Sequence, residues 1–427
     1  MPKPLSQLHT THHDGLVHHP LGSASYVFRD SFIPYLSSYC KQKTIKLRVG
    51  TQPNGSPHIG TVVTFATAFA IARRLREYLS AGKNHDDDDE ISVSVCVHFV
   101  DTAPSTFETA REVIDGVTYQ KSLRSTREFG THISPFSQLL DELSSAFEVP
   151  HEVLTQDELL DDRRMVGVVR DVVLQRDALS PAFDTGAETE AGRKFGIRSQ
   201  CPVKDCGRAD KWGQRTVYDG TVITFFCGIH GAYTVDLHAD EDVKRLEFNT
   251  PLRTLIRTEY FLADPKVSWI QVTGADYAGF YQEQLLWRHV SDPKAVLIVY
   301  APLVVDWAGS KISKSLYVRH GAYEYLRRTD MDYMLSFEGL MARRGSAISR
   351  LFDEVLHWID KPETFFRSYS VVYLHRIMSG NEVLAPEREP KNSPRWFGST
   401  LAGIHLWAVV ALVFLMGVLQ RISTSVV

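Results

Sequence analysis

A strand, a tight loop and a helix follow one another near the start of the sequence, and this order constrains the fold more than any other feature. Residues 45–49 alternate apolar and polar side chains, as a β-strand does. Residues 50–57 hold two glycines and two prolines, which interrupt the strand. Residues 62–79 form an Ala-rich amphipathic run with arginines near its end, as a helix does. The pattern predicts an α/β fold.

Further segments extend this alternation along the chain. Residues 91–100 are apolar and rich in β-formers, which predicts a strand buried on both faces. Shorter apolar runs at 267–273 and 295–305 predict two more strands, and a helix is expected over 280–290. Residues 121–180 predict helices with charged faces, so strands and helices alternate through most of the chain.

The composition is that of an ordinary folded chain. Of 427 residues, 44% are hydrophobic and 23% are charged, which excludes wholesale disorder and a multi-span membrane protein. The formal net charge of −4 provides no global positive field for nucleic acid or anionic lipid. Residues 1–20 are polar and His-rich rather than an apolar leader, and the five cysteines are an odd number. We therefore expect a protein of a reducing, cytoplasmic compartment.

One apolar segment near the C-terminus differs from the rest. Residues 401–419 carry no formal charge and lie between Arg395 and Arg421. Their length and position suit a tail anchor in an intracellular membrane. A buried C-terminal helix is one alternative, because His405 and several small residues dilute the apolar run. A divergent or misassembled reading frame is the other.

The loop between the first strand and the first helix carries residues suited to nucleotide binding. A Gly/Pro turn at the carboxyl end of a strand lets the backbone approach a nucleotide, and the start of the next helix presents free N–H groups to phosphate. His58 can donate to phosphate oxygens. Gly60, which has no side chain, leaves room for the ribose or the base.

A second loop, residues 309–315, holds two lysines among glycine and serines. Cations on a mobile loop suit a pyrophosphate leaving group, because negative charge develops on it as the α-phosphate is attacked. Lys311 and Lys314 supply the cations, and serines such as Ser313 add hydroxyl donors. The alternative interpretation is a solvated basic loop.

Together the two loops resemble the paired signatures, called HIGH and KMSKS, of the class I aminoacyl-tRNA synthetases. Their order, their spacing and the strand–loop–helix context agree with that family. The first signature has a second histidine where this chain has a threonine. The matching positions are Pro53, Gly55, His58, Ile59, Gly60 and Thr61 in the first loop, and Lys311, Ile312, Ser313, Lys314 and Ser315 in the second.

The resemblance implies a Rossmann-like parallel sheet and an ATP site that uses Mg²⁺. It implies catalytic roles for His58, Lys311 and Lys314. Gly274 and Asp276 are similar to a Gly-x-Asp element of the family, in which the acid meets the ribose. The ATP-binding residues that the resemblance implies are Pro53, Gly55, His58, Gly60, Thr61, Gly274, Asp276, Ser313 and Lys314.

The chain most resembles the lysyl group of the class, followed by the glutamyl and arginyl groups. A cationic substrate side chain would need a carboxylate in the pocket, for which Asp101, Asp276 and Glu283 are candidates. The helical region after the second loop is shorter than the anticodon-binding region of full synthetases. The resemblance therefore leads us to expect a truncated enzyme that transfers its amino acid to tRNA or to another acceptor, such as one in secondary metabolism.

Three cysteines and a histidine form the best metal-binding pattern in the sequence. Cys201 and Cys206 are followed by Cys227 and His230, within the Cys- and Gly-rich segment 195–240 that predicts an insertion. Three thiolates and an imidazole are a ligand set for structural zinc. Unliganded, partly buried cysteines are the alternative, because the first spacing is at the long end of the usual range.

Two arginines, Arg253 and Arg257, lie four positions apart and would share one face of a helix. Guanidinium groups in this arrangement can bind a phosphate, a tRNA terminus or a carboxylate. A structural ion pair is the alternative.

These features divide the sequence into consecutive regions of different character. A zinc-ribbon-like insertion and a C-terminal helical region accompany the Rossmann-like domain. The regions are a disordered His-rich arm (1–24), the first half of the catalytic domain with a helical insertion (25–190), the zinc-binding insertion (191–245), the second half of the catalytic domain (246–320), a helical region (321–385), a linker (386–400) and an apolar helix (401–420).

The leading functional prediction is ATP-dependent activation of an amino acid as its adenylate, followed by transfer. One alternative is a peptide former that consumes aminoacyl-tRNA, similar to the arginine-containing cyclodipeptide synthases. Retention of both ATP-contacting loops argues against it. The other alternative is a non-catalytic synthetase-like binding protein, which would be expected to lose His58 or Lys314 first; both are present.

Overall fold

The computed structural model divides the chain into two compact units, Met1–Glu382 and Val383–Val427. It describes residues 32–81, 91–183, 195–278, 297–312, 323–343 and 347–381, together with Leu286 and residues 289–292. All of these belong to the first unit. The predictions for the His-rich arm, the linker and the apolar segment 401–419 therefore lie outside the described residues, as do most of 280–290 and Ser313 and Lys314.

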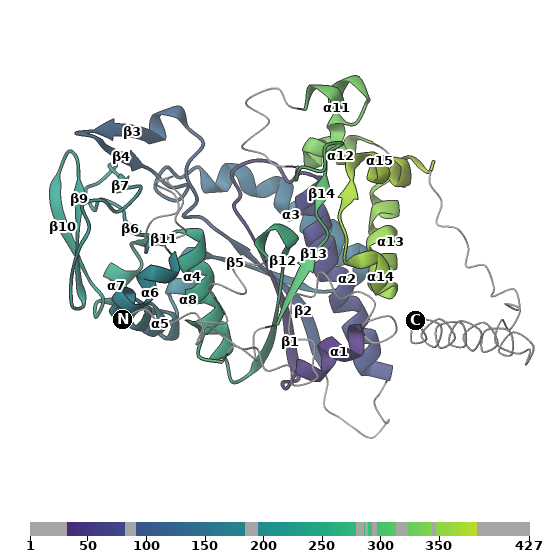
Figure 1. Ribbon diagram of the computed structural model, residues 1–427, viewed down its shortest axis with the longest axis horizontal. Helices are drawn as coiled ribbons and strands as arrows, with labels where there is room; N and C mark the ends of the chain where they lie inside the picture. The colour runs from purple at the N-terminus through teal and green to yellow at the C-terminus, as the bar shows by residue number, and fades with distance from the viewer. Residues whose placement is uncertain are drawn as a thin grey trace, which may run out of the picture. The chain divides into compact units, whose positions relative to one another are not determined.

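A five-stranded parallel sheet forms the centre of this unit (Figure 1). Its order is β13-β12-β1-β2-β5, so the first strand lies in the middle and the chain runs outward to one side and then to the other. This is the order of a doubly wound, Rossmann-like sheet. The strands are β1 (Thr44–Thr51), β2 (Ser92–Phe99), β5 (His151–Thr155), β12 (Val267–Gly274) and β13 (Ile298–Ala301).

Four of the five strands agree with the segments predicted from the sequence, and one does not. The prediction of helices throughout residues 121–180 is wrong at 151–155, where β5 pairs in parallel with β2. This strand is short, lies at the edge of the sheet and has no fully buried residue. It therefore lacks the continuous apolar run that marks a central parallel strand.

Helices cover both faces of the sheet, and the side chains of β1 point alternately to one face and to the other. Leu47 and its neighbours Ile45 and Val49 join a core with α2 (Ile59–Ala81), α3 (Ile133–Phe147) and α13 (Ala347–Asp360). The other face packs against α5 (Arg163–Leu174) and α8 (Thr250–Leu262) in a second core. Arg48 lies on that second face and is buried.

The remaining helices surround these two cores. Those after the sheet continue the helical region expected beyond residue 320, with a short parallel pair formed by β14 (Val304–Val305) and β15 (Tyr369–Ser370). The described helices are α1 (Phe32–Tyr39), α4 (Gln156–Leu160), α6 (Arg176–Phe183), α7 (Asp240–Val243), α11 (Glu324–Arg328), α12 (Phe337–Ala342), α14 (Pro362–Phe365) and α15 (Val371–Ser379), and the 3-10 helices span Glu108–Ala110, Phe129–His132, Ala275–Tyr277 and Asp332–Leu335.

Small antiparallel sheets make up the inserted region, as its short β-like runs predict. They also recruit a hairpin from earlier in the chain, which the sequence pattern does not predict. The sheets are β3-β4-β7 (Arg111–Ile114, Val117–Gln120, Ala209–Asp210), β8-β9-β10 (Val217–Asp219, Val222–Cys227, Gly231–Asp236) and the pair β6-β11 (Ile197–Ser199, Leu246–Phe248).

No helix in the described part of the chain combines the length and the hydropathy that a membrane span requires. The tail anchor predicted for 401–419 falls outside that part and stays a prediction.

Candidate functional site

A cavity of about 380 Å³ opens at the carboxyl ends of the central strands. β1 lies between β12 and β2, and the chain reverses its direction of winding at β1. Open parallel sheets bind their ligands at such a reversal, where loops from neighbouring strands leave a crevice. The cavity is lined by residues that follow β1 and β12 and by residues of α8.

The loop after β1 places an imidazole beside the start of a helix. α2 begins at Ile59, and the backbone N–H of Gly60 donates to Nδ1 of His58 at 3.0 Å. A neutral ring bonded in this way carries its proton on Nε2. A Cβ atom built on Gly60 would lie 2.9 Å from Cε1 of His58, so the missing side chain is what allows the ring to fold back over the helix start.

The same loop is anchored to the C-terminal helical region. Ser56 Oγ donates to a carboxylate oxygen of Glu338 at 2.6 Å and accepts from the backbone N–H of Phe337 at 2.9 Å. Both partners lie at the start of α12. The signature-like loop is therefore held between the sheet and a segment far away in the chain, at separations of 282 and 281 residues.

The other predicted loops also meet at this cavity. Asp276 follows β12 and forms an ion pair with Nζ of Lys311. Gly274 permits this position of Asp276, because a Cβ on Gly274 would lie 2.5 Å from its carboxylate oxygen. Nζ of Lys311 also lies 5.7 Å from the centre of the Tyr277 ring.

The cavity thus gathers six of the catalytic and ATP-binding residues that the resemblance implies. They are His58, Gly60, Thr61, Gly274, Asp276 and Lys311. Pro53 and Gly55 do not line it; Pro53 is buried and Gly55 partly exposed within the loop. Ser313 and Lys314 lie outside the described residues, so their predicted contacts remain predictions.

The base of the cavity is formed by three buried arginines, Arg48, Arg253 and Arg257, which we call the arginine floor. Arg48 comes from the middle of β1, and the other two come from one face of α8. The helix predicted to align Arg253 with Arg257 is confirmed. The sequence does not predict Arg48 as a site residue, because an alternating strand places its polar positions toward solvent in most sheets.

Burial and mutual repulsion disfavour the charges in this floor. Desolvation lowers the pKa of Arg48 to about 9. Desolvation, then repulsion from Arg253 and Arg48, also lowers the pKa of Arg257 well below its usual value. His98, which lines the same cavity, has a lowered pKa because it is buried and faces these cations, so it is neutral at pH 7.

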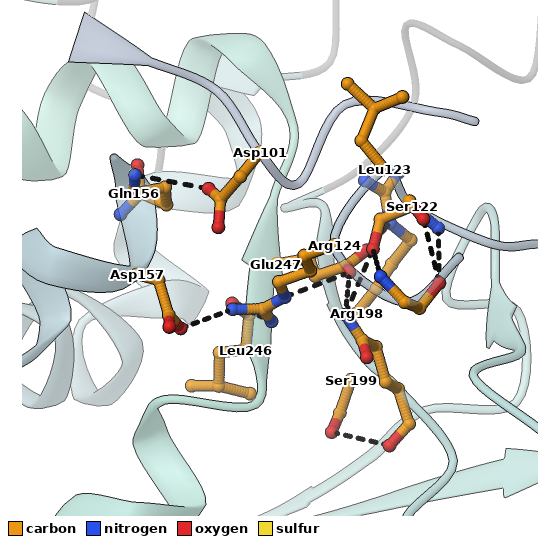
Figure 2. A network of polar contacts seen from close by, with 12 residues as sticks. Asp101, Ser122, Leu123, Arg124, Gln156, Asp157, Arg198, Ser199, Leu246 and Glu247 are labelled. Carbon is orange, nitrogen blue, oxygen red and sulfur yellow. Dashed lines mark hydrogen bonds and ion pairs between the residues drawn. The ribbon is translucent and has the colours of Figure 1, made fainter. Parts of the chain in front are cut away.

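The three candidate carboxylates for a cationic substrate are not arranged as such a pocket would need. Asp276 lines the cavity but pairs with Lys311, and Glu283 lies outside the described residues. Asp101 does not line the cavity; its carboxylate accepts from the backbone N–H of Gln156 at 3.1 Å (Figure 2). Burial raises the pKa of Asp101 to about 6.

The predicted metal ligands do come together. Ligand atoms of Cys201, Cys206, Cys227 and His230 all lie within 4.8 Å of one another. The sulfurs of Cys206 and Cys227 are 3.7 Å apart, and Nδ1 of His230 lies 3.4 Å from the sulfur of Cys201. Tetrahedral zinc with Zn–S bonds of about 2.3 Å needs sulfur atoms about 3.8 Å apart. The donor set and its spacing therefore fit a structural zinc ion.

The sequence matches no family model and no curated protein. Among solved structures, it is similar to glutamate-tRNA synthetase from Elizabethkingia anophelis (13% identity, TM-score 0.29, 65% of this chain and 54% of that chain). It is also similar to a glutamate tRNA ligase from Elizabethkingia meningosepticum (13%, 0.28, 65% and 53%) and to Thermus thermophilus arginyl-tRNA synthetase (10%, 0.30, 79% and 61%).

The chain thus spans about half the length of the two glutamate enzymes. The prediction that the chain is most like the lysyl group stays a prediction.

Proposed function

We propose that this protein activates an amino acid with ATP, producing an enzyme-bound aminoacyl-adenylate and pyrophosphate. The observation that carries the proposal is the ion pair between Lys311 and Asp276, both of which line the cavity that His58 also lines. This ion pair joins the lysine-bearing loop, residues 309–315, to the loop after β12, at the point where the winding of the sheet reverses. That convergence is what an ATP site at this position requires.

The chemistry needs groups that stabilise charge on the phosphates. A carboxylate oxygen of the amino acid attacks the α-phosphorus of ATP, the bond from that phosphorus to the β-bridging oxygen breaks, and pyrophosphate leaves. In the proposal, Nε2–H of His58 donates to a phosphate oxygen, and the positive end of the α2 helix dipole stabilises the phosphate charge. The two lysines of the second loop, Lys311 and Lys314, balance the charge on the leaving pyrophosphate.

The direct test is amino-acid-dependent exchange of pyrophosphate into ATP, measured on the full chain with MgATP and each of the twenty amino acids. We expect exchange with one amino acid or a small related group. His58→Ala should lower the exchange rate by about 100-fold to 1,000-fold, because a donor to the developing charge is lost. The matched control is His357→Ala, on α13 away from the cavity, which should keep the rate.

Absence of exchange with every amino acid would overturn activation by the protein alone. Repeating the assay with added tRNA then separates tRNA-dependent activation from none. Product formed from preloaded aminoacyl-tRNA without ATP would instead favour the alternative of a peptide former.

A milder variant tests how His58 is held. Gly60→Ala places a methyl group 2.9 Å from the His58 ring and has no unfavourable φ to explain a loss, so the ring has to turn away. We expect the maximal exchange rate to fall by about 10-fold with little change in KM for ATP. Gly167→Ala is the control, because a Cβ there meets nothing within 4 Å.

Transfer of the activated amino acid to tRNA is the second part of the proposal. It is supported by the resemblance of the two loops to the synthetase signatures. Incubation with labelled amino acid, MgATP and total tRNA should give acid-precipitable label that is released by mild alkali. Pyrophosphate exchange without labelled tRNA would indicate that the activated amino acid is transferred to another acceptor.

We also propose that Cys201, Cys206, Cys227 and His230 hold a structural zinc ion, on the fit of their spacing. Elemental analysis of the purified protein should find one zinc per chain. Cys206→Ser should lower the zinc content and the melting temperature. Cys40→Ser, a cysteine outside the cluster, should change neither the zinc content nor the metal-dependent part of the melting curve.

A further inference from the structure

Two members of the arginine floor, Arg48 and Arg257, are bonded to neutral side chains at positions where carboxylates would neutralise them. Arg48 donates to the side-chain oxygens of Gln271, at 2.5 Å, and Thr258, at 3.1 Å. Arg257 donates to the amide oxygen of Gln156 from both Nε and Nη2, at 3.1 and 2.7 Å. Among the described residues, no carboxylate forms an ion pair with Arg48 or Arg257.

This arrangement is costly for the protein alone. A guanidinium group keeps its proton at neutral pH, so it cannot escape its burial by becoming neutral, as a lysine can. Arg48 and Arg257 are only 7% and 6% exposed. Buried charges are stable when an opposite charge and further hydrogen bonds accompany them. Arg48 and Arg257 have the hydrogen bonds, but among the described residues no carboxylate forms an ion pair with either of them.

The side-chain amides bonded to Arg48 and Arg257 indicate why no carboxylate accompanies these arginines. Glutamate has nearly the same shape as glutamine and would accept the same hydrogen bonds while cancelling the charge. Gln156 and Gln271 therefore hold the arginines in place and leave their charge available. Since Arg48, Arg257 and Gln271 line the cavity, an anion that enters it can supply the missing charge.

We propose that the arginine floor binds the side-chain carboxylate of the substrate, so that the substrate is an acidic amino acid. This inference rests on the proposed function, because it names the substrate of that reaction. It reverses the expectation of a cationic substrate, for which the cavity offers Asp276, a carboxylate already paired with Lys311.

The depth of the floor separates this carboxylate from the one that reacts. Arg48 precedes the end of β1, Thr51, by three residues, which is about 10 Å along a strand. His58 and Lys311 lie in the loops beyond the strand ends. The α-carboxylate has to meet ATP among those loops, so the floor is left for a second carboxylate on the same molecule.

The experiment compares binding of amino acids and their neutral isosteres to the full chain by isothermal titration without ATP. L-Glutamate and L-aspartate are tested against L-glutamine, L-asparagine and L-lysine. We expect an acid to bind at least about 10-fold more tightly than its amide, because charge-assisted hydrogen bonds to the floor are lost in the amide. The α-carboxylate is common to all five ligands and cannot produce this difference.

The sharpest variant is Gln156→Glu, which supplies Arg257 with a carboxylate from the chain itself. This variant should lower the ratio of the affinity for the acid to the affinity for its amide by at least about 10-fold. It should also raise the melting temperature of the ligand-free protein. Gln175→Glu adds the same charge at an exposed position and should leave the preference unchanged. If Gln156→Glu fails to fold, Arg257→Gln should reduce the acid preference by a similar factor.

The outcomes distinguish this inference from the proposed function. Equal binding of acid and amide, preference for lysine, or no binding of either acid overturns the inference. If one of these is accompanied by exchange with a non-acidic amino acid, the proposed function stands alone. Tight binding of an acid without any exchange supports the floor as a carboxylate site and overturns adenylation. Loss of ATP or pyrophosphate binding in Gln156→Glu, with no acid preference in the wild type, assigns the floor to phosphate and overturns the inference.

Discussion

Two groups of arginines in this protein, one partly buried and one fully buried, have different partners. Arg124 and Arg198 share the carboxylate of Glu247, with nitrogen–oxygen distances of 3.7 and 3.6 Å (Figure 2). Glu247 is only 1% exposed. Arg48 and Arg257, in the arginine floor, have glutamines where the first group has a glutamate.

The difference shows that the fold supplies a carboxylate to arginines that serve a structural role, even where these are only partly buried. The Glu247 cluster joins β6 and β11 of the inserted region to the turn after β4, and its members are not among the residues that line the cavity at the strand ends. The floor lies under that cavity. A charge left unneutralised there is available to a ligand, whereas the charge in the cluster is already used to hold the insertion in place.

The largest effect is expected where the neutralising carboxylate is removed. Glu247→Gln keeps the shape but removes the charge that Arg124 and Arg198 share; Arg124 keeps its ion pair with Asp157, whereas Arg198 loses its carboxylate partner. Removing one partner of a buried ion pair costs about 3–5 kcal/mol. Chemical denaturation of the variant should show a loss of that order in the free energy of unfolding.

The matched control is Glu112→Gln, at a partly exposed pair with Arg208, where the loss should be about 1 kcal/mol or less. Equal losses in the two variants would mean that the cluster and the surface pair are energetically alike, which would remove the basis of the comparison.

In the arginine floor, a substitution that removes a charge is expected to raise the free energy of unfolding rather than lower it. Arg48→Met removes a buried cation that has no carboxylate partner among the described residues. Methionine keeps a long side chain against the ring of Phe261, whose centre lies 4.7 Å from the guanidinium carbon of Arg48. Replacing a buried charge by an apolar residue is often stabilising by about 1–4 kcal/mol. We expect the ligand-free variant to be about 2 kcal/mol more stable and to bind the substrate poorly.

Arg198→Met is the control for this prediction, since it removes an arginine that does have a carboxylate partner and should destabilise the protein. If Arg48→Met also destabilises, the floor is neutralised within the protein, and the contrast between the two groups fails.

The contrast also separates what the sequence can predict from what it cannot. The loops around His58 and Lys311 can be identified because their residue types are local, between a predicted strand and a helix or on a Gly/Ser-rich segment. The four zinc-ligand candidates can be identified by spacing in the same way. These are properties of short stretches of chain.

The floor and the Glu247 cluster depend on which segments pack together. Arg48 occupies a polar position of an alternating strand, which predicts exposure unless both faces of the sheet are covered. Helix α8 covers that face, and its residues come much later in the chain, as the 210-residue separation between Arg48 and Thr258 shows. Strand β5 escapes prediction for a related reason, because its pairing with β2 rather than its own pattern makes it a strand.

The smallest expected effect tests whether Asp101 serves as a hidden counter-charge for the floor. The charge of Asp101 favours the charged form of Arg257 more than that of any other acid does, although the two residues form no ion pair. Desolvation and the neighbouring arginines outweigh it, so the pKa of Arg257 is lowered. Burial nevertheless raises the pKa of Asp101 to about 6, whereas an aspartate in an unfolded chain titrates near pH 3.9. The folded state therefore binds more protons than the unfolded state between about pH 4 and pH 6, and stability falls as the pH rises through that window.

Asp101→Asn removes this slope while keeping an oxygen that can accept from the backbone N–H of Gln156. At pH 4 the variant and the wild type should be similar in stability, and at pH 7 the variant should be more stable by about 1–2 kcal/mol. Unfolding free energies measured at both pH values test this, with Asp353→Asn as an exposed control on α13 that should show no such difference. Destabilisation of Asp101→Asn at pH 7 would show instead that Asp101 neutralises Arg257, and the floor would then resemble the Glu247 cluster rather than a carboxylate site.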